Sequence, residues 1–327
     1  MDRIYESGAG QTVPKIPDAP SSGYPIAGNP ATGTPATRPG VWWYHMVMEE
    51  LMAVITAAGI HPDGNTLNQL VTAIQSGKLT APSLVGSVRN GKISVPAASS
   101  TATFTADEIV VETALGGAAY KIASINKTVN LATIGAGGMD TGAAPASGFV
   151  ALYAIYNPAT GAVALMATNA TAAAVPEVYG GANMPAGYKA SALISVLPVT
   201  SGLFNPILQF GRVINIVPSA ALISSVIQPN YTGLSISTIV PPSAIKIGGT
   251  IAAKNSSTGS QNTFLYLASN NNGIGAVGVE DSLTSASGSE IMCNFNLHLS
   301  ASQTLFYKST ATTGTPQYTI NISSYVF

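Results

Sequence analysis

Charged side chains are scarce in this sequence. Lys and Arg number 13 and Asp and Glu 14 among 327 residues, so 8% of the chain is charged, against roughly 25% in an ordinary soluble domain. The net charge of −1 offers no basic surface to the phosphate backbone of a nucleic acid, and the chain does not belong to the charge-rich class of disordered proteins. We therefore expect no nucleic-acid partner, and we expect hydroxyl-rich surfaces and subunit contacts in place of the missing charges.

Cysteine and long hydrophobic runs are scarce as well. The single cysteine, Cys293, excludes a disulfide within the chain, so stability has to come from packing or assembly. No uninterrupted apolar run approaches the roughly 18 residues of a transmembrane helix, and the first residues lack the apolar segment of a signal peptide. We expect a protein that is made in a cytoplasm and does not insert into a membrane.

Proline sets the first 40 residues apart. Seven of the 21 prolines fall in this segment. Because each proline removes a backbone donor and favours extended geometry in the residue before it, residues 1–40 are predicted to form an extended arm. The composition also fits a disordered tail, whereas Tyr5, Tyr24 and Ile26 favour an arm that docks on a partner.

Residues 41–80 predict a helical hairpin. The stretch from Val41 to Ile55 contains no Pro or Gly and is followed by Ala58-Gly59, a helix C-cap signal. After a turn, Thr66 to Gln69 have the spacing of a capping box that begins a second helix. The first helix is apolar nearly all round, which is typical of burial between subunits. We expect these residues at a trimer interface or attachment site: Trp42, Trp43, His45, Met46, Leu51 and Ile55.

From Pro82 onward, short β-rich runs alternate with Gly, Pro and Asn. Alternation such as Asn294 to Leu299 implies strands with one buried face, and residues 157–161 predict a hairpin loop. The pattern predicts a mainly β fold of antiparallel, β-sandwich-like domains, with a central domain over 83–217, a second over 218–327 and a boundary near Val217-Pro218. The expected strands are 108–112, 128–131, 149–156, 163–167, 192–197, 203–210, 236–240, 245–251, 264–267, 291–299, 305–307 and 318–326.

Several strings in the first two thirds of the chain resemble one family. They are Met1 to Gly8, Gly23 to Pro30, Thr34 to Thr37, Trp43 to Leu51, Ala106 to Val111, Ala114 to Gly117, Gly137 to Gly142, Ala151 to Pro158 and Tyr179 to Tyr188. Over residues 1–212 the chain closely resembles the tail fibre proteins of tailed bacteriophages. The last 115 or so residues resemble only the general style of variable, β-rich fibre tips.

The resemblance implies a fibrous homotrimer in the virion tail that acts outside the cell. It implies attachment to tail or baseplate proteins through the N-terminal region (1–40 as the attachment arm, 41–80 for trimerisation), a central shaft or shoulder and a receptor-binding tip over 218–327. The receptor would be lipopolysaccharide, capsule, a pilus or an outer-membrane protein. Some fibre tips hold an axial metal ion with His-x-His pairs, but the sequence Asn296-Leu297-His298 has one histidine, so we expect no metal and no cofactor.

Side chains for catalysis are few. The three histidines, His45, His61 and His298, form no cluster with metal-ligand spacing. A glycosidase needs two carboxylates across the bond that it cleaves, and the adjacent Glu280 and Asp281 of the last third would point to opposite faces of a strand. We expect no enzyme.

Tyr and Asn are the residues of the tip that suit a receptor, because they offer flat amphipathic surface and adaptable hydrogen bonds. The candidates are Tyr231, Tyr266, Tyr307, Tyr318, Asn255, Asn262, Asn270, Asn271 and Asn272, with the loops 255–262 and 269–273 favoured. Tyr266 shares the strand parity of Phe264, and such aromatics also fit a core or a trimer interface. Three alternatives stay open: a tail-associated polysaccharide depolymerase, a structural tail connector and the fibre of a phage-tail-like bacteriocin.

Overall fold

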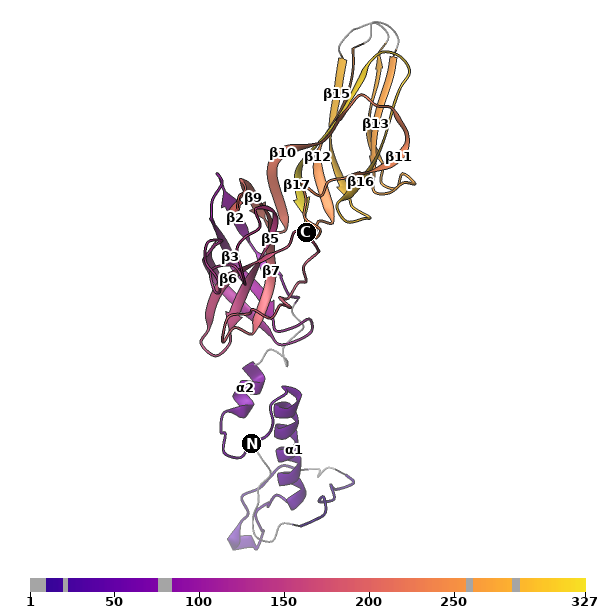
Figure 1. Cartoon of the computed structure of the whole chain (residues 1–327). Coiled ribbons are helices and arrows are strands. Elements are labelled where there is room, and N and C mark those ends of the chain that lie inside the picture. Colours follow the sequence, from indigo (N-terminus) through magenta and orange to yellow (C-terminus); the bar gives the residue numbers. More distant parts are fainter. Residues whose placement is uncertain (1–9, 20–22, 76–83, 257–260, 284–288) are drawn as a thin grey trace. The chain divides into compact units, whose positions relative to one another are not determined.

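The computed structural model describes residues 10–19, 23–75, 84–256, 261–283 and 289–327. The chain is mainly β, with 48% of residues in strands and 9% helical, and the strand pairs are antiparallel, as predicted. It divides into two compact units, residues 1–82 and 83–327, and Figure 1 labels most of their elements. The N-terminal string 1–8 and loop residues 257–260 lie outside the described residues.

The first unit contains the predicted helical hairpin. Helix α1 runs over Val41–Ala57 and helix α2 over Gln69–Gln75. Gly59 has a φ of 77°, the left-handed conformation that ends helices at a glycine. Ile55 and Ala58 pack with Ala73 of α2 in a small buried cluster, so apolar contact between the helices closes the hairpin.

The predicted capping box is wrong, because the Gln69 side chain forms its hydrogen bonds with residues that precede Thr66. Its Oε1 accepts from the Asp63 backbone N–H at 3.0 Å, and its Nε2 donates to the His61 carbonyl at 2.7 Å. Asp63 in turn accepts from the backbone of Asn65 and the hydroxyl of Thr66. The Asp63 turn therefore uses the groups that a capping box would have paired, and α2 begins at Gln69 instead of just after Thr66.

The proline-rich segment is not simply extended. Asn29 and Thr34 exchange backbone hydrogen bonds, and the Thr37 N–H donates to the Ile26 carbonyl at 3.0 Å. Between Asn29 and Thr34, the short 3-10 helix η1 (Pro30–Thr32) is capped by the Asn29 side chain and ends at Gly33 with a φ of 68°. The chain doubles back here because proline starts the turn, and a left-handed glycine ends it.

The second unit is built from two sheets. The larger, 13-stranded sheet has the order β15-β12-β17-β10-β9-β2-β3-β7-β5-β6, with β1 and β4 also on β3 and β8 on β7; the smaller has the order β11-β16-β13-β14. The strands of the described residues are β1 (Val88–Arg89), β2 (Lys92–Val95), β3 (Thr101–Glu112), β4 (Ala119–Asn130), β5 (Ser147–Asn157), β6 (Ala162–Asn169), β7 (Ala190–Thr200), β8 (Leu203–Phe204), β9 (Ile207–Phe210), β10 (Val213–Ser224), β11 (Gln228–Ser235), β12 (Lys246–Asn255), β13 (Gln261–Ala268), β14 (Val277–Leu283), β15 (Ser289–His298), β16 (Thr304–Ala311) and β17 (Pro316–Val326).

Most predicted strands are confirmed within these elements, and the 157–161 loop joins β5 to β6 with Gly161 at a φ of 72°. Two of the predicted strands are wrong. The run 203–210 is broken at Asn205-Pro206 into β8 and β9, since proline cannot donate in a ladder. The run 236–240 forms a turn whose Ile236, Ile239 and Val240 side chains are buried. The apolar character of this run therefore reflects burial in the core and not a strand.

Strand β10 passes through the boundary expected near Pro218. Its first part, from Val213, pairs with both β9 and β17, and its last part, to Ser224, pairs with β17 alone, with an irregularity in the β17 register between Asn215 and Ser219. The same strand therefore joins the β15-β12-β17 part of the large sheet to the part that begins with β9. A continuous set of buried side chains, from Ile93 through Val196 to Tyr325, fills the unit.

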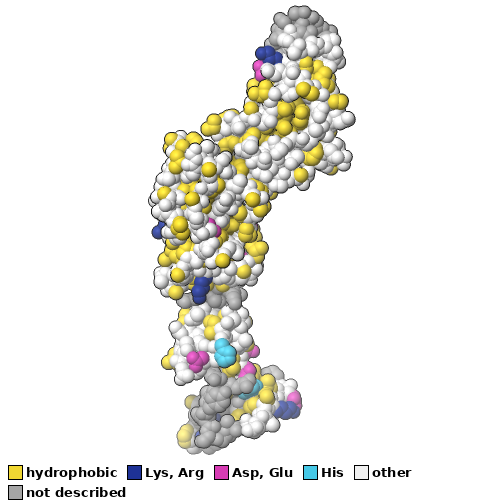
Figure 2. Space-filling model, viewed as in Figure 1, with side chains coloured by type: hydrophobic (Ala, Val, Ile, Leu, Met, Phe, Trp, Pro, Cys, Tyr) yellow, Lys and Arg dark blue, Asp and Glu magenta, His cyan; other side chains and the backbone are white. Residues whose placement is uncertain are grey.

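In the last third, inward side chains of both sheets meet. Ile251 and Ile320 of the large sheet and Leu265 and Leu305 of the small sheet are fully buried in this common core. Each sheet therefore has a second, outer face. Lys, Arg, Asp and Glu side chains are sparse on the side of the unit that Figure 2 shows.

Candidate functional site

The outer face of the small sheet carries aromatic side chains. In β13, Leu265 and Leu267 are fully buried, whereas Phe264 and Tyr266, at the alternate positions, are only partly buried. Successive side chains of a strand point to opposite faces. Phe264 and Tyr266 therefore lie on the outer face, where their rings are nearly parallel, at 16°, with centroids 6.3 Å apart.

Lys308 lies between two tyrosine rings on this face. It is the cross-strand partner of Tyr266, and its Nζ is 5.1 Å from the centroid of the Tyr266 ring and 5.0 Å from that of Tyr231 on β11. An ammonium within about 6 Å of a ring centroid is attracted to the negative face of the ring. We call these three residues the tyrosine–lysine cluster.

Two glycines make room for the tyrosine rings. Gly278 of β14 is the cross-strand partner of Tyr266, and a Cβ there would lie 2.8 Å from Cγ of Tyr266. Gly273 has a φ of 79°, and a Cβ there would lie 2.8 Å from Cε2 of Tyr231. Larger residues would displace both rings, so the sequence keeps these two positions open for the cluster.

The loop that holds Gly273 is the asparagine loop, residues 269–275. The Asn270 side chain organises it, since Oδ1 accepts from the backbone N–H groups of Asn272 at 3.0 Å and Ile274 at 3.1 Å. Asn271 and Asn272 are exposed. The structure thus brings the predicted residues Tyr231 and Asn270 to Asn272 to one end of the outer face.

Lys308 was not predicted from the sequence, and Tyr266 was left open between core and surface. The signal in the sequence was the shared parity of Phe264 and Tyr266, but both faces of β13 carry apolar residues, so parity alone could not tell which is outward. Lys308 joins the cluster only through the pairing of β13 with β16.

The hydroxyl of Tyr231 is protonated at neutral pH. Partial burial, with a smaller effect from Tyr266, raises the pKa of Tyr231 above its ordinary value. A protonated phenol can donate one hydrogen bond and accept others. Beside the three donors of the Lys308 ammonium, this hydroxyl gives the cluster both donor and acceptor capacity.

Two predicted receptor residues are buried, and the prediction that they contact a receptor is wrong. The Asn255 side chain is fully buried, and its Nδ2 donates to the Thr263 hydroxyl at 2.9 Å and to the Thr313 carbonyl at 2.8 Å. Tyr318 is fully buried in the common core, where burial raises its pKa to about 12. Both residues face inward, because β12 and β17 place them on the core side of the large sheet.

Tyr307 and Asn262 lie apart from the cluster. Tyr307 is partly buried against the core, on the inward parity of β16. Asn262 is exposed near the start of β13, whereas the asparagine loop follows the end of this 8-residue strand, which is about 25 Å long. Asn262 and the asparagine loop therefore lie at opposite ends of the small sheet and do not form one site.

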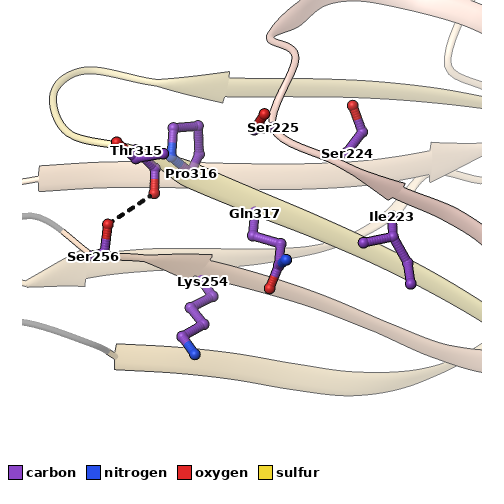
Figure 3. Close-up of a pocket in the computed structure, with 8 residues that line it drawn as sticks. All are labelled: Ile223, Ser224, Ser225, Lys254, Ser256, Thr315, Pro316 and Gln317. Carbon is purple, nitrogen blue, oxygen red and sulfur yellow. Dashed lines mark hydrogen bonds between the residues drawn. The ribbon is translucent and has the colours of Figure 1, made fainter.

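A pocket of about 420 Å³ lies near the end of the large sheet, close to Asn255. Figure 3 shows its lining side chains, with the hydroxyl of Ser256 donating to the Thr315 carbonyl at 3.4 Å. The lining is formed by Ile223, Ser224, Ser225, Lys254, Ser256, Thr315, Pro316 and Gln317. Among the described residues of this lining Lys254 alone is charged, and the apolar side chains of Ile223 and Pro316 lie beside serine and threonine hydroxyls.

In the first unit, the predicted interface residues divide into two groups. Ile55 is fully buried inside the unit, so it holds the hairpin together rather than contacting another subunit. Trp43 and Met46 are exposed, whereas Trp42, His45 and Leu51 are partly buried. His45 Nδ1 is 3.9 Å from the carboxylate of Glu49 one turn later.

A groove of about 750 Å³ separates the proline-rich segment from the start of α1. Its lining is formed by Ile16, Pro17, Ala19, Pro25, Thr37, Arg38, Pro39, Gly40, Trp42, Trp43 and Met46. Trp42 and Met46 are one helical turn apart on the same side of α1. The predicted interface residues at the start of the helix thus face the proline-rich segment of their own chain across this groove.

Glu280 and Asp281 do not form a pair that could act across one bond. Glu280 is exposed and Asp281 is 6% exposed, which confirms that these adjacent residues of β14 point to opposite faces. Within the described part of the chain, no three His, Cys, Asp or Glu side chains are placed to hold a metal ion together. The described helices include none with the length and apolar character to cross a membrane.

No protein-family model matches the chain, and no curated protein matches it in a sequence search.

Proposed function

We propose that the chain is the subunit of a homotrimeric tail fibre of a tailed bacteriophage, which attaches to the tail or baseplate through its N-terminal region and binds a receptor on the host cell through its C-terminal tip. The strings of residues 1–212 that resemble tail fibre proteins support the class of protein. The single observation that carries the receptor-binding role is the tyrosine–lysine cluster. It places two tyrosines and an ammonium group on an outer face, beside an exposed asparagine loop.

The outer face of the large sheet supports assembly into a trimer. Three successive cross-strand rows on this face contain no charged residue, so burying them would leave no charge without a partner. The rows are Met292, Ala252, Thr319 and Ile223; Asn294, Thr250, Asn321 and Ala220; and Asn296, Gly248, Ser324, Asn215, Leu208 and Ser94. Met292 and Ile223 are 59% and 65% exposed, which fits a surface that a second copy covers.

In this proposal, residues 218–327 form a β-sandwich-like tip. The large sheet turns the three uncharged rows of its outer face toward the other subunits, and the small sheet presents the tyrosine–lysine cluster to the receptor. Three clusters on one fibre would bind a repetitive cell surface together, and such multivalent contact converts modest affinity at each site into stable attachment.

The first helix supports the attachment role. Val41, Trp43, Tyr44, Met46 and Val47 are exposed large side chains on α1, and surface of this kind marks sites of contact with another protein. Either the other subunits or a tail protein would cover them.

Assembly is tested by native mass. Light scattering during size exclusion should give a value near three times 33.1 kDa. Met292→Glu should lower that mass toward a monomer, because the proposed interface would bury an unpaired carboxylate. Leu115→Glu, at a residue 71% exposed in the β3–β4 turn, is the matched control and should leave the mass unchanged. A monomeric unaltered chain would refute the trimer.

Receptor binding is tested with the labelled full chain on a panel of bacterial strains. Saturable binding to some strains, which an excess of unlabelled chain prevents, supports adhesion. The absence of binding to every strain to which the parent particle adsorbs would refute the receptor-binding role.

A further inference from the structure

We propose that the tyrosine–lysine cluster binds an acidic saccharide, that is, a sugar ring with a carboxylate or phosphate group. This inference rests on the proposed function, since it names the class of receptor that the tip would recognise. It is drawn from three features of the outer face: two hydroxyl-bearing rings, a lysine between them and a nearby loop of exposed amides.

The rings of Tyr231 and Tyr266 suit a sugar. An aromatic ring has a negative face and a positive edge, and the C–H groups on one face of a sugar ring carry partial positive charge, so the two stack. The tyrosine hydroxyls can then donate to and accept from sugar hydroxyls. A flat apolar ligand would use the ring faces but would leave these polar groups without partners.

Lys308 gives the preference for an acidic sugar. Among the residues that the structure describes, no carboxylate lies within ion-pair distance of its Nζ, so its charge is balanced only by the two ring faces. Glu280 lies on the same outer face beside Phe264, but it is two strands and one pair of residues away from Lys308, about 12 Å between backbones. No ion pair joins Lys308 to Glu280 or to another described carboxylate, so its ammonium can pair with a ligand anion.

The asparagine loop adds adaptable hydrogen bonds at the edge of the cluster. Asn270 is occupied in holding the loop, whereas the Asn271 and Asn272 side chains are exposed. A primary amide both donates and accepts, so it can pair with either polarity of a sugar hydroxyl. The cluster thus offers ring faces, a cation and amides within one surface, and that combination matches the mixed apolar and polar faces of a sugar.

The experiment compares treated cells of a strain that the full chain binds. Periodate cleaves vicinal diols of surface sugars, and proteinase K removes surface protein. Binding that is lost after periodate and kept after proteinase K is expected. Binding that survives periodate and is lost after proteinase K would overturn the saccharide, while the adhesive function would still stand. If the full chain binds no strain, the proposed function fails before this step is reached.

Variants locate the site on the cluster. Lys308→Met should weaken binding to the cells roughly tenfold or more, because a charge-assisted contact is lost, and it should reduce the weakening caused by added salt. Lys254→Met, at the pocket of Figure 3, is the matched control and should bind like the unaltered chain. Tyr231→Ala should also weaken binding, and circular dichroism would verify its fold. Unchanged affinity in both folded variants, Lys308→Met and Tyr231→Ala, would overturn the assignment.

Discussion

Replacing Asn255 by Ala should destabilise the tip without removing a receptor contact. Asn255 ends β12, and its amide joins Thr263 of β13 to the Thr313 carbonyl in the β16–β17 loop. The residue thus links the two sheets to the loop that joins β16 to β17. In Asn255→Ala, both hydrogen bonds are lost and the buried Thr263 hydroxyl loses a donor.

The magnitude follows from these contacts. Losing the hydrogen bond to the Thr313 carbonyl costs about 1 kcal/mol, and losing the one to Thr263, which leaves a buried hydroxyl without its donor, costs about 1–3 kcal/mol. The expected loss is therefore about 2–4 kcal/mol, a large share of the roughly 5–15 kcal/mol that stabilises a domain. For a unit of this size, this corresponds to a fall in Tm of roughly 5–15 °C.

Thermal unfolding at fixed protein concentration measures the effect. Asn271→Ala, in the exposed part of the asparagine loop, is the matched control and should change the stability by less than about 0.5 kcal/mol. Below its Tm, folded Asn255→Ala should bind cells as the unaltered chain does. An unchanged Tm together with weakened binding would refute the structural role and restore the receptor role that the sequence suggested.

Two further predictions concern the fold of the second unit. Gly249→Ala should destabilise it by about 1–3 kcal/mol, because a Cβ there would overlap the β17 backbone at the register shift between β12 and β17; Gly180→Ala, where a Cβ meets open space, should be neutral, and equal Tm values for both variants would contradict this reading. Stability should also fall as the pH rises above about 10. Burial, together with the Asp140 carboxylate that accepts its hydrogen bond, raises the pKa of Tyr179 to about 12, and full burial raises the pKa of Tyr325. The folded state therefore holds protons that the unfolded state releases above its own pKa, so the stability is present below about pH 10 and lost above it. Thermal unfolding from neutral to strongly alkaline pH measures the effect; a Tm that is constant through this range would contradict it, and Tyr325→Phe should reduce the slope.

The elements were largely predictable because local patterns encode them. The run without Pro or Gly before Gly59 predicted α1, and the 157–161 loop between two apolar runs predicted the β5–β6 hairpin. The capping box at Thr66 was wrong because the Asp63 side chain, six residues before Gln69, organises the turn. A local pattern is reliable only where no nearby side chain competes for the same backbone groups.

The candidate site was harder to predict, since it depends on which strands pair. Tyr231, Tyr266 and Lys308 come from three strands spread over 78 positions of the sequence, and the order β11-β16-β13 alone brings them together. Asn255 and Asn270 looked alike in the sequence, as polar residues next to Gly- and Ser-rich loops. Pairing buried the first and left the second at the surface.

The sequence by itself determined that this protein is mainly β and antiparallel, has a helical hairpin after a proline-rich segment and has few charges with which to cover its surface. These properties follow from composition and from the spacing of apolar residues along a strand or helix, which are local. The tertiary structure decided which face of each strand is outward and which polar residues are buried. Burial depends on contacts such as that of Asn255 with Thr313, 58 residues away, and local propensity carries no information about a partner at that distance.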